Sequence, residues 1–258
     1  MERKYGLIGY PLGHSFSQRY FTEKFERDGI DAAYSLYPLE NINLLSSLIS
    51  DSSNLEGLNV TIPYKEDVIR FLDEVSDDVK EIGAVNVIKI SNKDGKRSLK
   101  GYNSDFVGFS DSLKPILREE VKNALVLGTG GASKAVVYAL KNLGITPTLV
   151  SRTHKEGVLS YEDLNEEIMA KNLLIVNTTP LGMFPKVDAC APIPYHLLTG
   201  AHICYDLVYN PETTEFMRRA EERGATVKNG LEMLYRQAER AWDIWNSSLE
   251  EYYLRNQS

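Results

Sequence analysis

The chain has 258 residues, a formal net charge of −7 and a sequence pI of about 5.3. This acidic balance argues against a surface for nucleic acid or an anionic membrane, although a local basic pocket for a phosphate is compatible with it. The two cysteines are too few for a disulfide framework and belong to no metal motif, and no apolar run is long enough to span a bilayer. The composition therefore predicts a soluble, cytoplasmic protein that binds a small molecule, and the length, which allows one large or two modest domains, is expected to give two.

The N-terminal part alternates between segments with strand-like and helix-like apolar spacing. The predicted strands are 4–9, 32–39, 57–62 and 86–90, and the predicted helices are 17–28 and 42–50. The third strand ends at Pro63, which lacks the N–H that a strand ladder needs, and Lys65 follows. Because ligands of α/β proteins usually bind beyond the carboxyl ends of strands, Lys65 is a candidate for chemistry, with a solvated loop charge as the alternative.

A second series of strands and helices begins after Pro115, where a charge cluster precedes a new apolar strand. Its predicted strands are 123–128, 146–151, 172–177, 203–208 and 225–229. Their alternation with helical segments is typical of a parallel sheet with helices on both faces. From Leu231 to Leu249, apolar and aromatic residues at helical spacing predict a long final helix of about five turns.

Residues 123–140 have the order strand, glycine turn and helix that a dinucleotide site requires. Gly128 permits a tight turn, Gly130 lets the backbone approach a pyrophosphate, and the helix after Gly131 offers N–H groups and a positive dipole end. Ser133 stands where the usual pattern has a third glycine. The arrangement predicts dinucleotide binding, with a glycine turn that holds no ligand as the alternative.

The next strand ends in Ser151, Arg152 and Thr153, where an NAD site would carry an acid for the ribose hydroxyls. A guanidinium can pair with a 2′-phosphate in a planar fork, whereas an acid would repel that phosphate. The sequence therefore predicts NADP rather than NAD. Lys155 is a second positive charge for the phosphate or a solvated lysine, and His154 is expected to be an ordinary surface residue.

Short motifs along nearly the whole chain resemble the shikimate dehydrogenase family, in that family's order. They are GYPLGHSFS (9–17), NVTIPYK (59–65), GAVNV (83–87), GYNSD (101–105), GTGGA (128–132), SRT (151–153), NTTPLGM (177–183), YDLVYNP (205–211) and GLEMLYRQA (230–238). The resemblance implies an α/β fold with two domains facing a cleft. A mixed N-terminal substrate domain would comprise residues 1–107 and 236–258, and a Rossmann-like, doubly wound NADP-binding domain residues 108–235. The final helix would return to the first domain.

The resemblance also implies a reaction, the reversible NADP-dependent reduction of 3-dehydroshikimate to shikimate on the route to chorismate and aromatic amino acids. It places Lys65 and Asp105 at the reacting centre. Reduction of a ketone creates an oxyanion as hydride arrives, and a nearby ammonium can stabilise that charge and deliver a proton. Asp105 is expected to accept a hydrogen bond from Lys65 and to bind a substrate hydroxyl; without the resemblance it would be a turn or helix-cap residue.

The remaining contacts follow from motif positions in the resemblance. Expected substrate ligands, besides Lys65 and Asp105, are Ser15, Ser17, Asn59, Thr61, Asn86, Tyr209 and Gln237, with the two serines donating to the carboxylate. Expected cofactor contacts are Gly128, Thr129, Gly130, Gly131, Ala132, Ser151, Arg152, Thr153, Asn177, Thr178, Leu207, Gly230 and Met233. His14 is expected to be a structural loop residue, and no metal is expected.

The chain departs from the family pattern after the two serines. The family usually continues with proline and then a His-Asn pair, whereas this chain has Gln18 and then Tyr20 and Phe21. Proline fixes φ and stiffens a helix start, so its loss predicts a slightly altered start with the serines retained. Ser104 and Ser151 replace the usual Thr and Asn and keep a hydrogen-bonding side chain.

The sequence leaves two other interpretations. One is a quinate/shikimate dehydrogenase with a broader substrate range or NAD use, against which the two serines and Arg152 argue. The other is an NADPH-binding sensor without catalysis, against which the presence of both Lys65 and Asp105 argues, since dinucleotide binding requires neither. The sequence leaves open whether the chain forms a homodimer.

Overall fold

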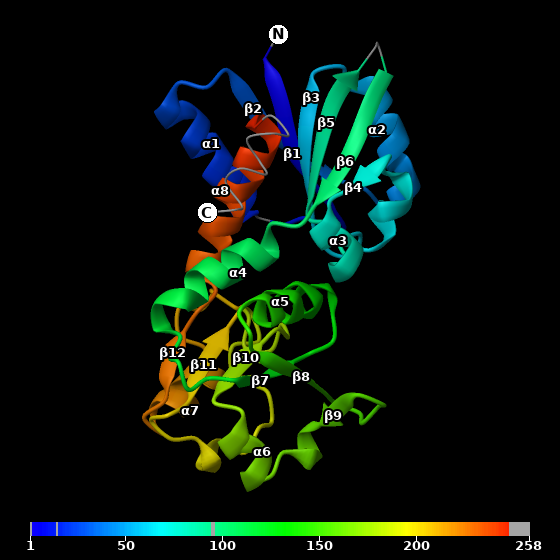
Figure 1. Ribbon diagram of the computed structural model, residues 1–258. Helices are drawn as coiled ribbons and strands as arrows, with labels where there is room; N and C mark the ends of the chain where they lie inside the picture. Colours follow the sequence, from blue (N-terminus) through cyan, green and yellow to red (C-terminus); the bar gives the residue numbers. More distant parts are fainter. Residues whose placement is uncertain (1, 14, 94–95, 248–258) are drawn as a thin grey trace. The chain divides into compact units, whose positions relative to one another are not determined.

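The computed structural model describes residues 2–13, 15–93 and 96–247 (Figure 1). They form two compact units, one made of the described residues in 2–104 and 238–247, and the other of Asp105–Gln237. The divisions predicted from the sequence lie after residues 107 and 235. His14, and the predicted continuation of the last helix to Leu249, lie outside the described residues. Within the described ranges, none of the helices has the length and apolar character needed to cross a membrane.

The first unit is built on a mixed sheet of six strands in the described residues. Their spatial order is β2 (Ala32–Pro38), β1 (Arg3–Gly9), β3 (Leu55–Val60), β5 (Val87–Lys93), β6 (Lys96–Tyr102) and β4 (Glu74–Val75). β5 runs antiparallel to both of its neighbours, and the other neighbouring pairs are parallel. The four strands predicted from the sequence are confirmed, while β4 and β6 were not predicted.

The predicted C-terminal end of the third strand was wrong. It was expected to reach Ile62, but β3 stops at Val60 because the chain turns there. The N–H of Thr61 donates to the carbonyl of Ile8 at 2.9 Å, and the N–H of Tyr64 closes a turn on the carbonyl of Thr61 at 3.0 Å.

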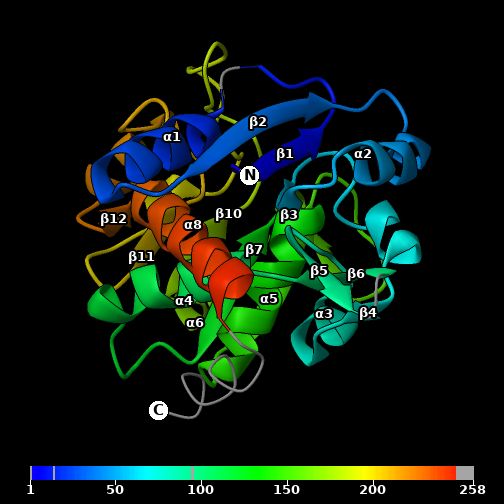
Figure 2. The ribbon, with the colours of Figure 1, turned by 90° about the horizontal axis from the view of Figure 1, so that it is seen from above.

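Helices cover both faces of this first sheet (Figure 2). On one face, α1 (Phe16–Asp28) and the C-terminal half of α8 (Leu231–Asn246) enclose an aromatic core. On the other face, the covering elements are α2 (Leu45–Asp51), α3 (Asp77–Ile82) and the 3-10 helices Ile42–Leu44 and Asp67–Phe71. The sheet therefore lies between two layers of helices.

Trp245 fastens α8 to this sheet. A Cβ at Gly57 of β3 would come within 2.4 Å of the indole ring. Because glycine has no Cβ, the ring can pack directly against the sheet at this residue. The indole Nε1 then donates to the carbonyl of Ile88 in β5 at 3.0 Å. The predicted return of the final helix to the first domain is confirmed.

The second unit contains a six-stranded sheet that is parallel throughout. Its spatial order is β9 (Val158–Ser160), β8 (Thr146–Ser151), β7 (Asn123–Leu127), β10 (Leu174–Asn177), β11 (Ile203–Asp206) and β12 (Thr226–Lys228). Counted along the chain, this is the order 3-2-1-4-5-6 of a doubly wound sheet, whose direction of winding reverses between β7 and β10. The predicted Rossmann-like α/β class is confirmed.

Helices also cover both faces of the second sheet. α4 (Asp105–Leu113), α5 (Gly131–Asn142) and the first turns of α8 pack on one face, and α6 (Glu166–Lys171) and α7 (Glu215–Glu221) on the other. Phe109 and Leu113 of α4 are fully buried in the core of this unit. For this reason the division between the units falls at the start of α4.

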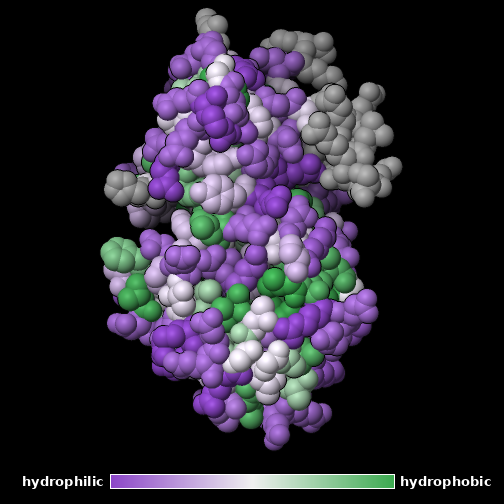
Figure 3. Space-filling model, turned by 90° about the vertical axis from the view of Figure 1, so that its left-hand side faces the viewer, coloured by the Kyte–Doolittle hydropathy of each residue, from purple (hydrophilic) through white to green (hydrophobic). Residues whose placement is uncertain are grey.

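The protein surface is mainly hydrophilic on the face drawn in Figure 3, in keeping with its charged composition. Some large apolar side chains are nevertheless exposed, and three of them, Met183, Phe184 and Val187, lie in the one loop that follows β10. Scattered apolar residues on a surface are normal.

Candidate active site

Several segments of the first unit meet at one edge of its sheet. β1 and β3 are parallel, so their carboxyl ends lie together, and the reversed β5 begins beside the end of β3, where Asn59 pairs with Val87. β6 returns to the same edge, where Tyr102 also pairs with Val87. The predicted site residues of the first unit lie on the segments that meet at this edge: Ser15, Ser17, Asn59, Thr61, Lys65 and Asn86.

Ser17 and Asn59 meet at the hydroxyl of Tyr34, a buried residue of β2. The Tyr34 hydroxyl donates to Asn59 Oδ1 at 2.7 Å, and Ser17 forms a hydrogen bond with the same hydroxyl. Burial raises the pKa of Tyr34 well above its usual value, and the bond with Ser17 opposes that rise. Tyr34 therefore keeps its proton and acts as a hydrogen-bond donor. Asn59 Nδ2 reaches the carbonyl oxygen of Asn86 at 3.4 Å.

Asn86 and Ser104 form two reciprocal hydrogen bonds. The N–H of Ser104 donates to Asn86 Oδ1 at 2.7 Å, and Asn86 Nδ2 donates to Ser104 Oγ at 3.0 Å. Asp105, the next residue, is buried in the first turn of α4, where the positive end of the helix dipole favours a carboxylate. Lys65 is half-buried, and its carbonyl oxygen accepts from the N–H of Val85 at 2.7 Å. The segment 85–86 thus anchors the backbone of both Lys65 and Ser104.

Ser15 caps α1, the helix that begins where the chain departs from the family pattern. Its side-chain oxygen accepts from the N–H of Gln18 at 3.5 Å. Proline at position 18 would have no N–H for this bond. Gln18 therefore supplies a cap contact that a proline could not make.

Tyr20 and Phe21, at the place of the family's His-Asn pair, take part in packing. The Tyr20 hydroxyl donates to Glu239 of α8, which also pairs with Lys24 at 3.2 Å. Phe21 is fully buried and stacks on Tyr34, with ring centroids 4.8 Å apart. These replacements fix α1 against α8 and against β2.

The predicted cofactor residues of the second unit lie at the carboxyl ends of its strands, in the loops that follow them, or in the first turns of α5 and α8. α5 starts directly after β7, with Gly130 as its N-cap, and among the described residues no side chain caps it. Gly128 has φ of 109°, and a Cβ there would lie 2.8 Å from Thr178 Oγ1, so the position suits glycine only. A Cβ at Gly130 would meet nothing within 4 Å. The helix N-terminus is thus open to an approaching anion.

The rest of this loop fits the same interpretation. Thr129 is exposed, and Gly131 and Ala132 form the first turn of α5. The hydroxyl of Ser133 donates to the carbonyl of Gly130 at 2.6 Å. Ser133, which replaces the third glycine of the usual pattern, is buried and ties the turn to itself.

Arg152 is exposed in the loop after β8, as an accessible phosphate-binding cation must be. Its charge lowers the pKa of the neighbouring Tyr161 hydroxyl, against burial, which raises it more strongly. The loop is ordered by Ser151, whose hydroxyl donates to the carbonyl of Thr153 at 2.6 Å and accepts from its N–H at 3.3 Å. His154 is exposed, as expected.

Asn177, at the end of β10, is completely buried, and its side chain is engaged within the protein. Its Nδ2 donates to Asp206 at 2.9 Å, and its Oδ1 accepts from the N–H and hydroxyl of Thr179 at 3.1 and 2.6 Å. Thr178 is more exposed, and its N–H and hydroxyl both donate to the carbonyl of Leu127, at 2.9 and 2.6 Å. Asn177 therefore shapes this loop, and Thr178 has the more accessible side chain.

Asp206, at the end of β11, is a buried acid that the sequence does not single out. Besides Asn177, its carboxylate accepts from the hydroxyl of Thr214 at 2.6 Å and the N–H of Val208 at 3.0 Å. Burial raises the pKa of Asp206 to about 6, and these three hydrogen bonds oppose the rise. The motif YDLVYNP contains this residue, but nothing in the sequence indicates its partners. The carboxylate joins the ends of β10 and β11 to the start of α7.

The remaining predicted residues lie around the start of α8. A Cβ at Gly230 would come within 2.1 Å of the carbonyl oxygen of Leu207, so only glycine fits there. Met233, one turn into α8, is buried in the core of the second unit. Tyr209 is exposed and Gln237 is half-buried. These last two are predicted substrate ligands that belong to the second unit.

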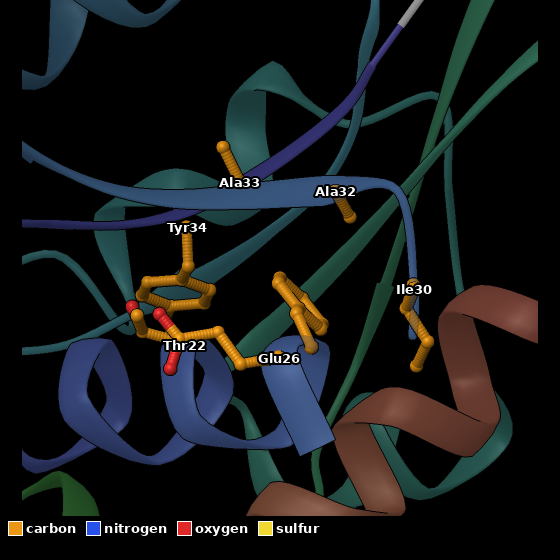
Figure 4. Close-up of a pocket in the computed structure, with 7 residues that line it drawn as sticks. Thr22, Glu26, Ile30, Ala32, Ala33 and Tyr34 are labelled. Carbon is orange, nitrogen blue, oxygen red and sulfur yellow. The ribbon is translucent and has the colours of Figure 1, made fainter. Parts of the chain in front are cut away.

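A hollow of about 270 Å³ opens on the first unit between α1 and β2 (Figure 4). It is lined by Thr22, Phe25, Glu26, Ile30, Ala32, Ala33 and Tyr34. None of the predicted site residues lines it, so it is not part of the candidate site. In residues 2–13, 15–93 and 96–247, no three His, Cys, Asp or Glu side chains form a group that could hold a metal ion.

The sequence of this chain is similar to that of known proteins. Residues 7–88 match the family described as the shikimate dehydrogenase substrate binding domain. A shikimate dehydrogenase (NADP(+)) from Clostridium beijerinckii is 40% identical over 253 residues, which cover 93% of this chain and 91% of that relative. This chain belongs to the shikimate dehydrogenase family.

Solved structures agree with that assignment. The shikimate 5-dehydrogenase of Thermus thermophilus, in complex with NADP(H) and shikimate, is 31% identical and has a TM-score of 0.82, covering 95% of this chain and 93% of that one. A quinate dehydrogenase from Corynebacterium glutamicum, in complex with NAD, is 26% identical with a TM-score of 0.82, covering 95% and 94%. The resemblance seen in the motifs is confirmed, and similar structures have been solved with either dinucleotide.

Asp206 makes a testable contribution to stability. Its folded-state pKa of about 6 lies above the ordinary value of 3.8, so the folded protein binds this proton more tightly than the unfolded chain does. The stabilisation from this proton binding is fully present below about pH 4 and is lost as the pH rises through 6. We expect the free energy of unfolding of the wild type, relative to that of Asp206→Asn, to fall by up to about 3 kcal/mol between about pH 4 and pH 7. Urea unfolding of both proteins across this range measures the difference, and a constant difference would contradict the assignment.

Proposed function

We propose that this protein is an NADP-dependent oxidoreductase that reversibly reduces 3-dehydroshikimate to shikimate, a step towards chorismate and the aromatic amino acids. The observation that carries the proposal is the 40% identity to a shikimate dehydrogenase (NADP(+)) over 93% of this chain. The polar edge of the first sheet and the glycine loop of the second supply the two kinds of binding site that the reaction needs.

The first unit is proposed as the substrate domain. Its sheet edge offers hydroxyls from Ser15, Ser17 and Thr61 and amides from Asn59 and Asn86. Such groups both donate and accept hydrogen bonds, which suits a small polyhydroxylated acid. Because the two amides are buried, a ligand that lacked a matching hydroxyl would leave polar groups unpaired, and the site would reject it.

Lys65 is proposed as the group that stabilises the developing oxyanion. NADPH, when bound, would supply a hydride to the carbonyl carbon of the ketone, whose oxygen would then need a partner for its negative charge. The Lys65 ammonium donates a hydrogen bond and a proton to that oxygen, and in the reverse direction the amine takes the proton of the substrate hydroxyl. Asp105 is proposed to act on the same substrate by accepting a hydrogen bond from a ring hydroxyl. Tyr209 and Gln237 complete the proposed substrate contacts.

The second unit is proposed as the NADP domain, and its residues fit that cofactor. The open N-terminus of α5 after Gly130 suits the pyrophosphate, and the exposed Arg152 with Ser151 and Thr153 suits the 2′-phosphate. No acidic residue stands in this triplet, where an NAD site would carry one for the ribose hydroxyls. The segments that contain Asn177, Thr178, Leu207, Gly230 and Met233 would border the nicotinamide side.

A quinate/shikimate dehydrogenase that uses NAD is the second candidate, favoured by the similarity to the NAD complex of a quinate dehydrogenase. In the main proposal the protein is cytoplasmic and its ligand is a small molecule.

Light scattering of the purified protein would decide whether it forms a homodimer.

Nicotinamide absorbance at four combinations of substrate and cofactor tests the proposal directly. Purified protein is given shikimate or quinate with NADP or NAD. We expect rapid reduction of NADP by shikimate and much slower reactions for the other pairs. Efficient oxidation of quinate with NAD would favour the second candidate, and NADPH binding without any turnover would favour a sensor.

Lys65→Ala should lower kcat by about 10²–10⁴, the usual contribution of a positioned proton-transfer group, with a smaller effect on KM. Steady-state kinetics with shikimate and NADP measure both constants. The matched control is Lys171→Ala, which removes an exposed lysine at the end of α6 and should leave kcat unchanged. An unaltered kcat in Lys65→Ala would refute the role of Lys65.

Arg152→Ala should weaken NADPH binding about ten- to hundredfold and leave NADH binding nearly unchanged, since only NADPH carries the 2′-phosphate. Fluorescence titration with each cofactor gives the two dissociation constants. Arg223→Ala, which removes an exposed arginine elsewhere on the second unit, is the control for a general loss of positive charge. Equal losses for the two cofactors would mean that Arg152 does not bind the 2′-phosphate.

A further inference from the structure

We propose that Tyr34 is a positioning residue for the substrate, which it serves by fixing the orientation of the Asn59 amide. The inference rests on the proposed function and adds to it a residue that the family motifs do not contain. Tyr34 lies in β2, outside all of those motifs. Its ring extends from β2 towards α1, as Figure 4 shows.

The ring of Tyr34 is held in place on more than one side. Phe21 stacks on it at a centroid distance of 4.8 Å and an interplanar angle of 13°. The Trp245 ring lies 6.5 Å away at 44°. Tyr34 is only 5% exposed, so its hydroxyl has little room to leave its partners. A fixed ring can therefore hold a neighbouring polar group in one orientation.

A count of donors and acceptors gives that orientation. Tyr34 has one hydroxyl proton and donates it to Asn59 Oδ1 at 2.7 Å. The bond between Ser17 and Tyr34 must then use the Ser17 proton and a lone pair of Tyr34. Asn59 Nδ2 points towards the carbonyl oxygen of Asn86, which can only accept. The Asn86 carbonyl thus requires Nδ2 to face it, and the Tyr34 hydroxyl stabilises this orientation by donating to Oδ1 on the other side.

This orientation decides what Asn59 can offer to a ligand. Its Oδ1 accepts from Tyr34 with one of its two lone pairs, while its Nδ2 carries two protons, of which the Asn86 carbonyl takes one. The amide therefore keeps a second N–H for a ligand, which favours a substrate oxygen that accepts. Ser17 can still turn its proton to a substrate carboxylate, because a hydroxyl rotates about its C–O bond and the bond from Tyr34 to Asn59 does not depend on it.

Tyr34→Phe removes only the hydroxyl and keeps the ring stacking. It leaves the buried Asn59 Oδ1 without its donor, and only the 3.4 Å bond from Nδ2 to the Asn86 carbonyl then holds the amide. We expect KM for shikimate to rise about tenfold, with kcat changed less than about threefold and KM for NADP unchanged. Steady-state kinetics, with shikimate binding measured by calorimetry in parallel, report these quantities.

Tyr5→Phe is the matched control. Tyr5 belongs to the same aromatic core and is fully buried, and its hydroxyl donates to Glu56 at 3.0 Å rather than to a predicted site residue. Its ring stacks on Trp245 with ring centroids 4.8 Å apart, just as the ring of Tyr34 stacks on Phe21. Each variant therefore removes one hydroxyl from a buried, stacked ring. We expect Tyr5→Phe to lower the melting temperature and leave KM for shikimate unchanged.

A double-mutant cycle tests whether Tyr34 acts through Asn59. If it does, Tyr34→Phe combined with Asn59→Ala should bind shikimate no more weakly than Asn59→Ala alone. Additive losses would overturn the proposed route, and a KM in Tyr34→Phe equal to that of Tyr5→Phe would overturn the role of Tyr34 altogether. A wild type that neither binds nor oxidises shikimate would instead refute the proposed function itself, and this inference with it.

Discussion

The direction of the strands is the constraint on which the candidate site depends. In the first sheet β5 alone is antiparallel to its neighbours, and this single reversal brings the start of β5 to the edge where β1, β3 and β6 end. Asn59 and Asn86 can therefore share a hydrogen bond although 27 residues separate them. In the second sheet no strand is reversed, so every loop after a strand leaves by the same edge.

At the site edge of the first sheet, burying a side-chain amide costs free energy unless the amide has a hydrogen-bond partner. Asn59, Asn86 and Asn103 are almost fully buried, and each bonds to neighbouring backbone or side chains; Asn103 Nδ2, for example, donates to the carbonyl of Ala84 at 2.9 Å. The same bonds that offset desolvation also fix which atom of each amide can face a ligand. Stability and selectivity thus arise from one set of contacts in the first unit.

The sequence predicts those features that depend on local spacing, and misses those that depend on distant partners. Apolar periodicity located β1 and α5, and motif positions identified the segments that meet at the two edges. β6 was missed because charged residues interrupt its pattern; one of them, Arg97, donates to the carbonyls of Ser53 and Leu55. Tyr34 and Asp206 look like core residues in the sequence, since only the fold brings Ser17 and Asn59, or Asn177 and Thr214, to them.

The aromatic core of the first unit has a consequence for the order in which the protein can fold during synthesis. Ala241, Ile244 and Trp245 of α8 belong to the same buried cluster as Tyr5 and Phe21, near the other end of the chain. A ribosome makes the whole second unit, which is continuous in sequence, before it makes these residues. The unit that begins the chain therefore completes its core last, and until then it exposes an apolar face to the cell's chaperones.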